Sequence, residues 1–212
     1  DGTYSGRGAN VRLGTDFFIA KNHTIGFLAS VRDGDGNSDD LNITEISPAR
    51  NPEQIDSVLI ANNRNIRDND QQTFNVNYRF DDGKRSLNVD LDYGRYSNDA
   101  DRFQPNRYFT ADRATPLSSL INRFDTPTLI QISTGKIDYE DGLLGGKFGA
   151  GTKISRVTSD NTFRVFDEIN ENFVQNDRRS NLFFYDENVY AGYINYSRKI
   201  NEKWNFSAGL RA

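Results

Sequence analysis

The chain has 212 residues, of which 26 are basic and 30 acidic, so its net charge is −4. The absence of cysteine excludes a disulfide framework, a zinc–thiolate site and a thiol nucleophile. Because the sequence carries neither a basic stripe nor an apolar run of about 18 residues, we expect no nucleic-acid partner and no transmembrane helix.

The first predicted elements are strands 9–20 and 24–32, in which apolar and polar residues alternate with the period of two typical of a strand with one apolar face. A turn at 21–23 joins them into a hairpin. The expected cross-strand pairs are Ile19 with Ile25, Phe17 with Phe27, and Leu13 with Val31. The only histidine, His23, falls in this turn among polar neighbours, and we expect neither an active site nor enzymatic activity.

The segment 33–40 is rich in carboxylate and amide side chains. Oxygen ligands at alternate positions suit a hard cation such as calcium. The candidate metal ligands are Asp33, Asp35, Asn37 and Asp39. The pattern departs from an EF-hand loop, because Ser38 stands in place of the turn glycine and Thr44 in place of the bidentate glutamate. The other interpretation is a solvated acidic loop without metal, and no other cofactor is expected.

The whole segment 33–70 is polar and is predicted to be a long loop. Asn51-Pro52-Glu53 could begin a short helix, since proline is favoured in the first helical turn. Strand extension and irregular loop remain open as alternatives.

The clearest alternation lies in the predicted strands 71–80 and 85–96, on either side of 81–84. Gly83 can adopt the positive φ that tight hairpin loops need. If Phe80 is paired with Arg85, every pair beyond this first one brings an apolar side chain opposite an apolar one or a polar opposite a polar. The expected pairs are Tyr78 with Leu87, Val76 with Val89, Phe74 with Leu91, Arg79 with Ser86, Asn77 with Asn88, and Asn75 with Asp90.

Two further hairpins follow. Strands 127–140 and 143–158 meet at Asp141-Gly142, and strands 186–198 and 202–212 meet at 199–201. In the last hairpin the expected pairs are Tyr196 with Trp204, Ile194 with Phe206, and Tyr190 with Leu210. The connecting polar segments are predicted to be long loops, and the first of them contains Thr115-Pro116, another helix start with the same alternatives. These two loops are 97–126 and 159–185.

These elements predict an all-β fold, an antiparallel up-and-down meander of about eight strands. Short turns that alternate with long polar connections are the layout of outer-membrane β-barrels. A soluble β-sandwich has no reason to alternate so regularly, and its inward face packs against a second apolar face. We therefore expect residues 1–212 to form a single β-barrel segment, part of a larger outer-membrane barrel.

The face opposite the apolar one carries charges of both signs. In lipid, an arginine or lysine at the bilayer centre costs about 2–4 kcal/mol, so these side chains are expected to face a wet lumen. The candidate lumen-facing binding residues are Asp16, Asn75, Asn77, Arg79, Asn88, Asp90, Asp92 and Arg211. In a soluble sheet the same residues face bulk water and have no functional meaning.

Residues 185–193 begin a strand with the acidic pair Asp186-Glu187, and residues 204–211 end one with Gly-Leu-Arg. Together with 136–140, 149–153 and the first hairpin, these stretches resemble the barrel of Bacteroidota TonB-dependent receptors. The resemblance implies a barrel of about 22 strands, with a plug domain and a TonB-contacting segment. Neither is recognisable in this sequence.

By this resemblance, the whole protein takes up a bulky ligand, such as an iron-siderophore, a glycan or a peptide, across the bacterial outer membrane with energy supplied through TonB. The implied partners are outer-membrane lipid, TonB and the plug domain through the full-length parent, and an unidentified transported ligand. The family has no fixed ligand motif in this region, so no binding residue is carried over.

Two alternatives remain. One is a complete small barrel that acts as an anchor or adhesin, and the lack of a terminal aromatic residue argues against it. The other is a soluble β-rich ligand-binding module. The mean hydropathy of −0.74 is unremarkable for such a module and tolerable for a barrel, because only alternate residues of a barrel strand face lipid.

Overall fold

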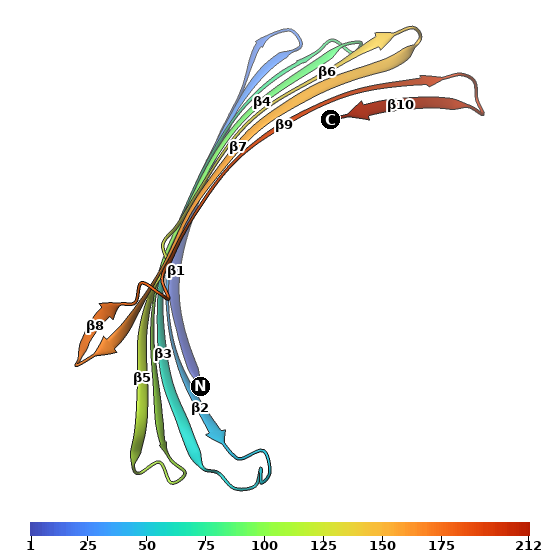
Figure 1. Ribbon diagram of the computed structural model, residues 1–212. Coiled ribbons are helices and arrows are strands. Elements are labelled where there is room, and N and C mark those ends of the chain that lie inside the picture. The colour runs from blue at the N-terminus through green and yellow to red at the C-terminus, as the bar shows by residue number, and fades with distance from the viewer.

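The computed structural model describes residues 1–212 as one antiparallel sheet of ten strands without a helix (Figure 1). The structure therefore contains no helix that could span a bilayer. The strands are β1 (Gly2–Ala20), β2 (His23–Ile46), β3 (Ser57–Asp81), β4 (Ser86–Thr110), β5 (Pro116–Asp125), β6 (Thr128–Leu143), β7 (Gly146–Ile169), β8 (Asn172–Gln175), β9 (Asn181–Lys199) and β10 (Asn205–Arg211).

The strands follow one another across the sheet as a meander, as predicted. β5 and β6 together occupy one position between β4 and β7, and Thr126-Pro127 interrupts them. Pro127 has no N–H for a ladder hydrogen bond, and the break falls at this residue, although β4 continues through Pro105. β8 pairs only with the end of β7, and this hairpin projects away from the sheet (Figure 1). β1 and β10 each pair with a single strand, so the sheet has two open edges.

The strands are longer than the sequence pattern indicated. β2, β3, β4 and β7 each span 24 or 25 residues, so the predicted loops 33–70, 97–126 and 159–185 are mostly strand. The two proposed helix starts are wrong, because Asn51-Pro52 lies in a turn and Pro116 begins β5. Long stretches of these extensions, such as 33–40 and 67–72, are polar on both faces, so the period-two signal disappears there although backbone pairing continues. Apolar residues such as Val58 and Val165 return toward the far ends of β3 and β7.

The predicted registers are wrong by an even number of residues. Val76 pairs with Leu91 instead of Val89. Phe17 pairs with Ile25 instead of Phe27, and Ile194 with Leu210 instead of Phe206. An even shift keeps each side chain on its predicted face, since successive residues of a strand point to opposite faces.

The turns account for these shifts. The β3–β4 hairpin closes at Asp81 and Ser86, where the Asp82 carboxylate accepts the backbone N–H groups of Lys84 at 2.9 Å and Arg85 at 2.7 Å. Gly83 has a φ of 85°. Between β6 and β7 the turn lies at Leu144-Gly145 rather than at Asp141-Gly142, and both turn residues have positive φ, as a two-residue type I′ turn requires.

The sheet has almost no core. Only seven of the 212 residues are buried, and most large apolar side chains are partly or largely exposed. Of 153 backbone hydrogen bonds, 136 lie within strands, so the cross-strand ladder holds the layer together. An apolar face this exposed on a single layer needs a partner of some kind.

We predict that the β3–β4 turn loses stability in acid. The N–H groups of Arg85 and Lys84 lower the pKa of Asp82 from 3.8 to about 2. A carboxyl group whose folded pKa is depressed stabilises the fold above its unfolded pKa and loses that contribution as the pH falls through the folded value. The urea midpoint is expected to fall between pH 3.8 and about 2, and less so in Asp82→Asn. An NMR titration that gives Asp82 a pKa near 3.8 contradicts this account.

Candidate functional site

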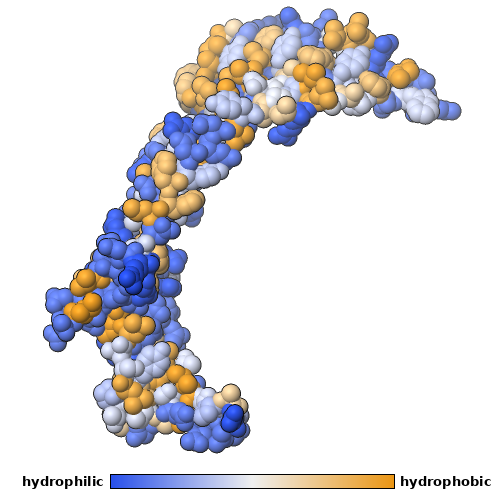
Figure 2. Space-filling view, viewed as in Figure 1, coloured by the Kyte–Doolittle hydropathy of each residue, from blue (hydrophilic) through white to orange (hydrophobic).

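The apolar side chains lie in rows across one face of the sheet, here called the apolar face. One such row joins β1 to β6 through register partners, and it consists of Phe17, Ile25, Tyr78, Val89 and Ile137. Its neighbours are largely open to the surroundings, with Leu91 and Ile154 each 55% exposed. Figure 2 shows large apolar patches toward the end that carries the short β6–β7 and β9–β10 turns.

The apolar rows form a slanted band. On β1 the last apolar residue before the polar extension is Val11. Arg95 of β4 lies in the same row as Val11, so on β4 the last apolar residue is Tyr93, one row nearer the short turns. On β7 the last apolar residue is Ile154, one row nearer still, because Arg156, the next residue of β7 on this face, lies in the same row as Tyr93. The boundary thus moves by two rows toward the short turns between β1 and β7.

The opposite boundary moves in the same direction. His23, the first residue of β2, shares a row with Leu210, but β10 continues apolar for two more rows to Phe206. Both boundaries of the band therefore slant together. Tilted strands that cross an apolar slab of constant thickness require this displacement from strand to strand.

His23 belongs to this face and not to a turn, which corrects the prediction. Its Nδ1 lies 2.8 Å from the Tyr78 hydroxyl, and its ring centroid lies 4.8 Å from that of Phe80. The histidine therefore packs at the short-turn border of the apolar band.

The opposite face, here called the polar face, brings together seven of the eight predicted candidates. Asp16, Asn77 and Asp90 lie in one row with Lys136 and Lys153. The seven residues, on β1, β3 and β4, are Asp16, Asn75, Asn77, Arg79, Asn88, Asp90 and Asp92. Arg211 is distant from them, on β10 opposite Tyr193.

Amide and carboxylate side chains on the polar face are hydrogen-bonded across the strands. The Asn77 Nδ2 group donates to Asp90 at 2.6 Å, and the Asn75 Nδ2 group donates to Asp92 at 2.7 Å. Arg79 pairs with Asp81 along its own strand at 3.1 Å. The two carboxylates are therefore held by amides in a cross-strand ladder and are not paired with each other.

Sequence reasoning missed a cluster on β6, β7 and β9 of the polar face. The Tyr193 hydroxyl donates to Asp138 at 2.5 Å, and the Lys136 ammonium contacts the other oxygen of Asp138 at 2.5 Å. The Tyr193 ring crosses Gly151, where a Cβ would overlap the ring and lie 2.6 Å from the Asp138 carboxylate. Only the true register reveals this contact, because Asp138 and Tyr193 are 55 residues apart.

The predicted calcium loop is not a loop. Residues 33–40 lie within β2, and the four candidate ligands Asp33, Asp35, Asn37 and Asp39 follow one another along a strand. Alternate residues of an extended strand are too far apart in a line to surround one ion. No group of three or more histidine, cysteine or acidic residues in the structure could hold a metal. Asp35 instead pairs with Arg7 at 2.9 Å.

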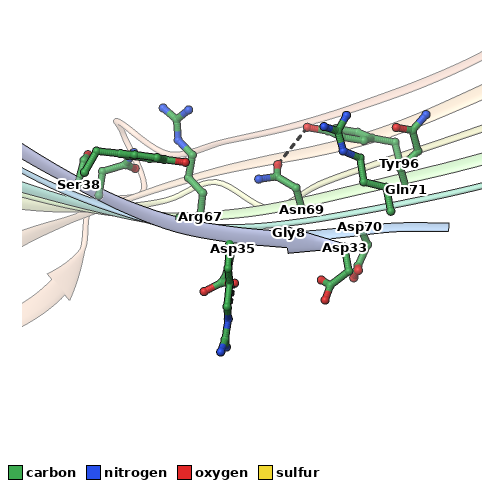
Figure 3. A pocket seen from close by; sticks show the side chains of 15 residues that line it. Gly8, Asp33, Asp35, Ser38, Arg67, Asn69, Asp70, Gln71 and Tyr96 are labelled. Carbon is green, nitrogen blue, oxygen red and sulfur yellow. Dashed lines mark hydrogen bonds and ion pairs between the residues drawn. The ribbon is translucent and has the colours of Figure 1, made fainter. Parts of the chain in front are cut away.

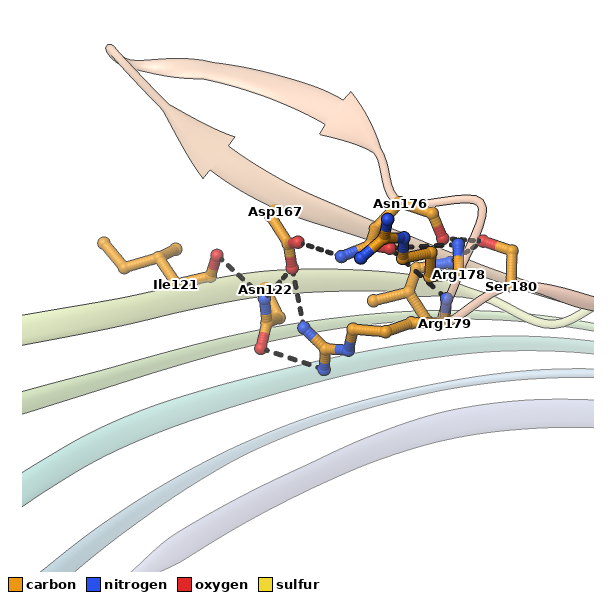
Figure 4. Close-up of polar contacts among 8 residues, drawn as sticks. Ile121, Asn122, Asp167, Asn176, Arg178, Arg179 and Ser180 are labelled. Atoms are coloured by element: carbon orange, nitrogen blue, oxygen red, sulfur yellow. Dashed lines mark hydrogen bonds and ion pairs between the residues drawn. The ribbon is translucent and has the colours of Figure 1, made fainter.

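A second missed cluster fixes the connection from β8 to β9. Asp167 accepts hydrogen bonds from Asn122 at 2.7 Å, Asn176 at 2.5 Å and Arg179 at 2.6 Å (Figure 4). Asn122 is only 3% exposed. These bonds fasten residues 176–180 to β5 and β7 over the continuation of the polar face. No local pattern predicts them, since the partners are distant in the sequence.

We predict that Gly151→Val destabilises the protein by about 1–3 kcal/mol, the usual cost of inserting methyl groups into a filled site. The new side chain must displace the Tyr193 ring from Asp138. Gly192→Val is the matched control, because a Cβ at Gly192 would come no closer than 3.9 Å to a neighbouring atom, the Gly151 carbonyl oxygen. Urea titrations measure both, and equal losses of stability would contradict the proposed role of the tyrosine contact.

Comparison with known proteins identifies one family. The profile described as the outer membrane protein beta-barrel family matches residues 78–212. The matched region runs from the end of β3 through β10. No curated protein matches the chain significantly.

Proposed function

Because the chain belongs to the outer membrane protein beta-barrel family, whose place is the bacterial outer membrane, we propose that it forms part of the barrel of a TonB-dependent receptor. The receptor takes up a bulky ligand from outside the cell. The slanted apolar band is the observation that carries this proposal.

Outer-membrane lipid is the proposed partner of the apolar face. The band consists of exposed apolar side chains on a single layer, and its slant matches tilted strands in a slab of hydrocarbon. Hydrocarbon offers no hydrogen bonds, so the backbone groups of a spanning strand must be paired within the sheet. The continuous ladder meets that requirement everywhere except at β1 and β10.

The open edges support a larger barrel. β1 and β10 each lack one neighbour, and their free N–H and C=O groups cannot face lipid at low cost. Further strands of the parent protein are proposed to pair with these edges and close the barrel. The polar face then lines its interior, where water solvates the ladder of Asn77, Asp90 and their neighbours.

TonB and a plug domain are proposed partners of the full-length parent. Two features support this assignment. The acidic start of the segment 185–193 and the Gly-Leu-Arg end at 209–211 resemble TonB-dependent receptors, and the sheet spans ten strands without closing. A wide barrel needs a plug to remain sealed, and energy from TonB would release it for uptake.

Deletion strains test the proposed function. The gene, the gene for TonB, and both together are deleted in the source bacterium, and uptake of ferric siderophores, oligosaccharides and peptides is measured. We expect one ligand whose uptake is lost equally in all three strains. Uptake of a small solute through unrelated porins is the control for membrane integrity. Uptake that needs this gene but proceeds without TonB contradicts the proposal and indicates a passive channel.

A further inference from the structure

A groove of about 580 Å³ lies beyond the apolar band, on the continuation of the polar face over β1 to β4. Figure 3 shows Arg67, Asn69 and Tyr96 on one side of the sheet, and Asp33 and Asp35 on the other. Most side chains that line the groove come from the first side. They are Tyr4, Arg32, Ser38, Asn65, Arg67, Asn69, Gln71 and Tyr96.

The groove exists because its floor lacks side chains. Gly8 pairs with Gly34 and Gly6 with Gly36, which leaves four glycines side by side on two strands. A Cβ on Gly6 would lie 2.7 Å from the Tyr4 hydroxyl. The tyrosine therefore lies across bare backbone, while 79% of its surface remains exposed.

Arginines without ion-pair partners line this face. Arg32, Arg67 and Arg102 are exposed, and no carboxylate lies within ion-pair distance of any of them. On the opposite face Arg7 is paired with Asp35 at 2.9 Å. Asp33, Asp35 and Asp70 also border the groove, but their side chains lie on the other side of the sheet and form no ion pair with Arg32, Arg67 or Arg102 (Figure 3).

A second hollow extends the groove along the sheet. It has a volume of about 250 Å³, shares Asn65 and Arg67 with the first, and adds Arg102. The two hollows form a track with guanidinium groups at intervals across β2, β3 and β4. A track of this kind fits an extended ligand with repeated anionic groups better than a single small anion.

The remaining lining suits hydroxyl groups. Amides such as Asn69 and Gln71 both donate and accept hydrogen bonds, as sugar hydroxyls do. Tyr4 and Tyr96 are the only hydrophobic residues among the 15 that line the first groove. Each offers an apolar ring face beside a polar hydroxyl, which matches the mixed surface of a pyranose.

We propose that this track binds an acidic oligosaccharide, whose carboxylate or sulfate groups pair with Arg32, Arg67 and Arg102. Guanidinium groups bind such oxyanions through two parallel hydrogen bonds. The amides bind the hydroxyls and the tyrosines cover the sugar rings. The proposal rests on the proposed uptake function and specifies its ligand class.

Binding to the purified protein tests the proposal. The protein as encoded, with any chain beyond these 212 residues, is purified in detergent. An oligouronate, a sulfated oligosaccharide and a neutral oligosaccharide of equal length are titrated by calorimetry at low and high salt. We expect one acidic oligosaccharide to bind and salt to weaken it, and the arm that binds distinguishes carboxylate from sulfate. Arg67→Ala is expected to weaken binding about tenfold or more, as loss of a charged hydrogen bond does.

Arg64→Ala is the matched control, because Arg64 is an exposed arginine of the same strand on the opposite face. It should leave binding unchanged. Circular dichroism melts check that both variants fold, and Arg32→Ala replaces Arg67→Ala if the latter does not. The proposal is overturned if neither acidic oligosaccharide binds, if the neutral one binds equally well, or if Arg64→Ala weakens binding as much as the groove variant.

The outcomes separate this proposal from the uptake function. Calorimetry does not require TonB. If the acidic oligosaccharides fail to bind while another ligand enters in a TonB-dependent manner, the groove assignment alone is wrong. If they bind but their uptake proceeds without TonB, the proposed transport function alone is wrong.

Discussion

The structure depends on one constraint, a single sheet whose backbone is paired from strand to strand and whose two faces lie in different surroundings. With seven buried residues, packing inside the chain cannot account for where its apolar side chains lie. Lipid on one side and water on the other explain why Val76 and Asn77, adjacent in the chain, belong to an apolar row and a hydrogen-bonded polar row. The slant of both band boundaries agrees with that explanation, since an apolar layer of fixed depth meets tilted strands at a different residue on each.

Outside the apolar band the same strands continue with mostly polar side chains. Alternation ends where the surroundings become aqueous on both faces, but the ladder continues to Ile46 on β2 and back from Ser57 on β3. On the extensions, Asp33, Asp35 and Asp70 share the continuation of the apolar face with Arg7 and Arg64, while Arg32, Arg67 and Arg102 lie on the continuation of the polar face. The contact of Asp167 with Arg179 then holds the β8–β9 connection over the polar side. The fold thus places a glycine-floored groove beyond the apolar band.

The sequence was sufficient to predict which residues share a face but not which residues are paired. Period two determines the face, so Asn75, Asn77, Asp90 and Asp92 were grouped correctly. Register depends on the turn, and the Asx contacts of Asp82 shift it without changing local hydrophobicity. The limits of the strands were unpredictable for a related reason, because a strand with water on both faces has no apolar period. The Tyr193–Asp138 contact and the arginine track require the register itself, and so the sequence pattern could not reveal them.

A cysteine scan of β3 tests the central claim most directly. The chain has no cysteine, so single cysteines at positions 74–79 are the only thiols of the chain when the protein is reconstituted in lipid vesicles. A charged, water-soluble maleimide should label positions 75, 77 and 79 quickly and positions 74, 76 and 78 slowly. Uniform labelling along the strand, or faster labelling at the even positions, would contradict a sheet with hydrocarbon on one side and water on the other.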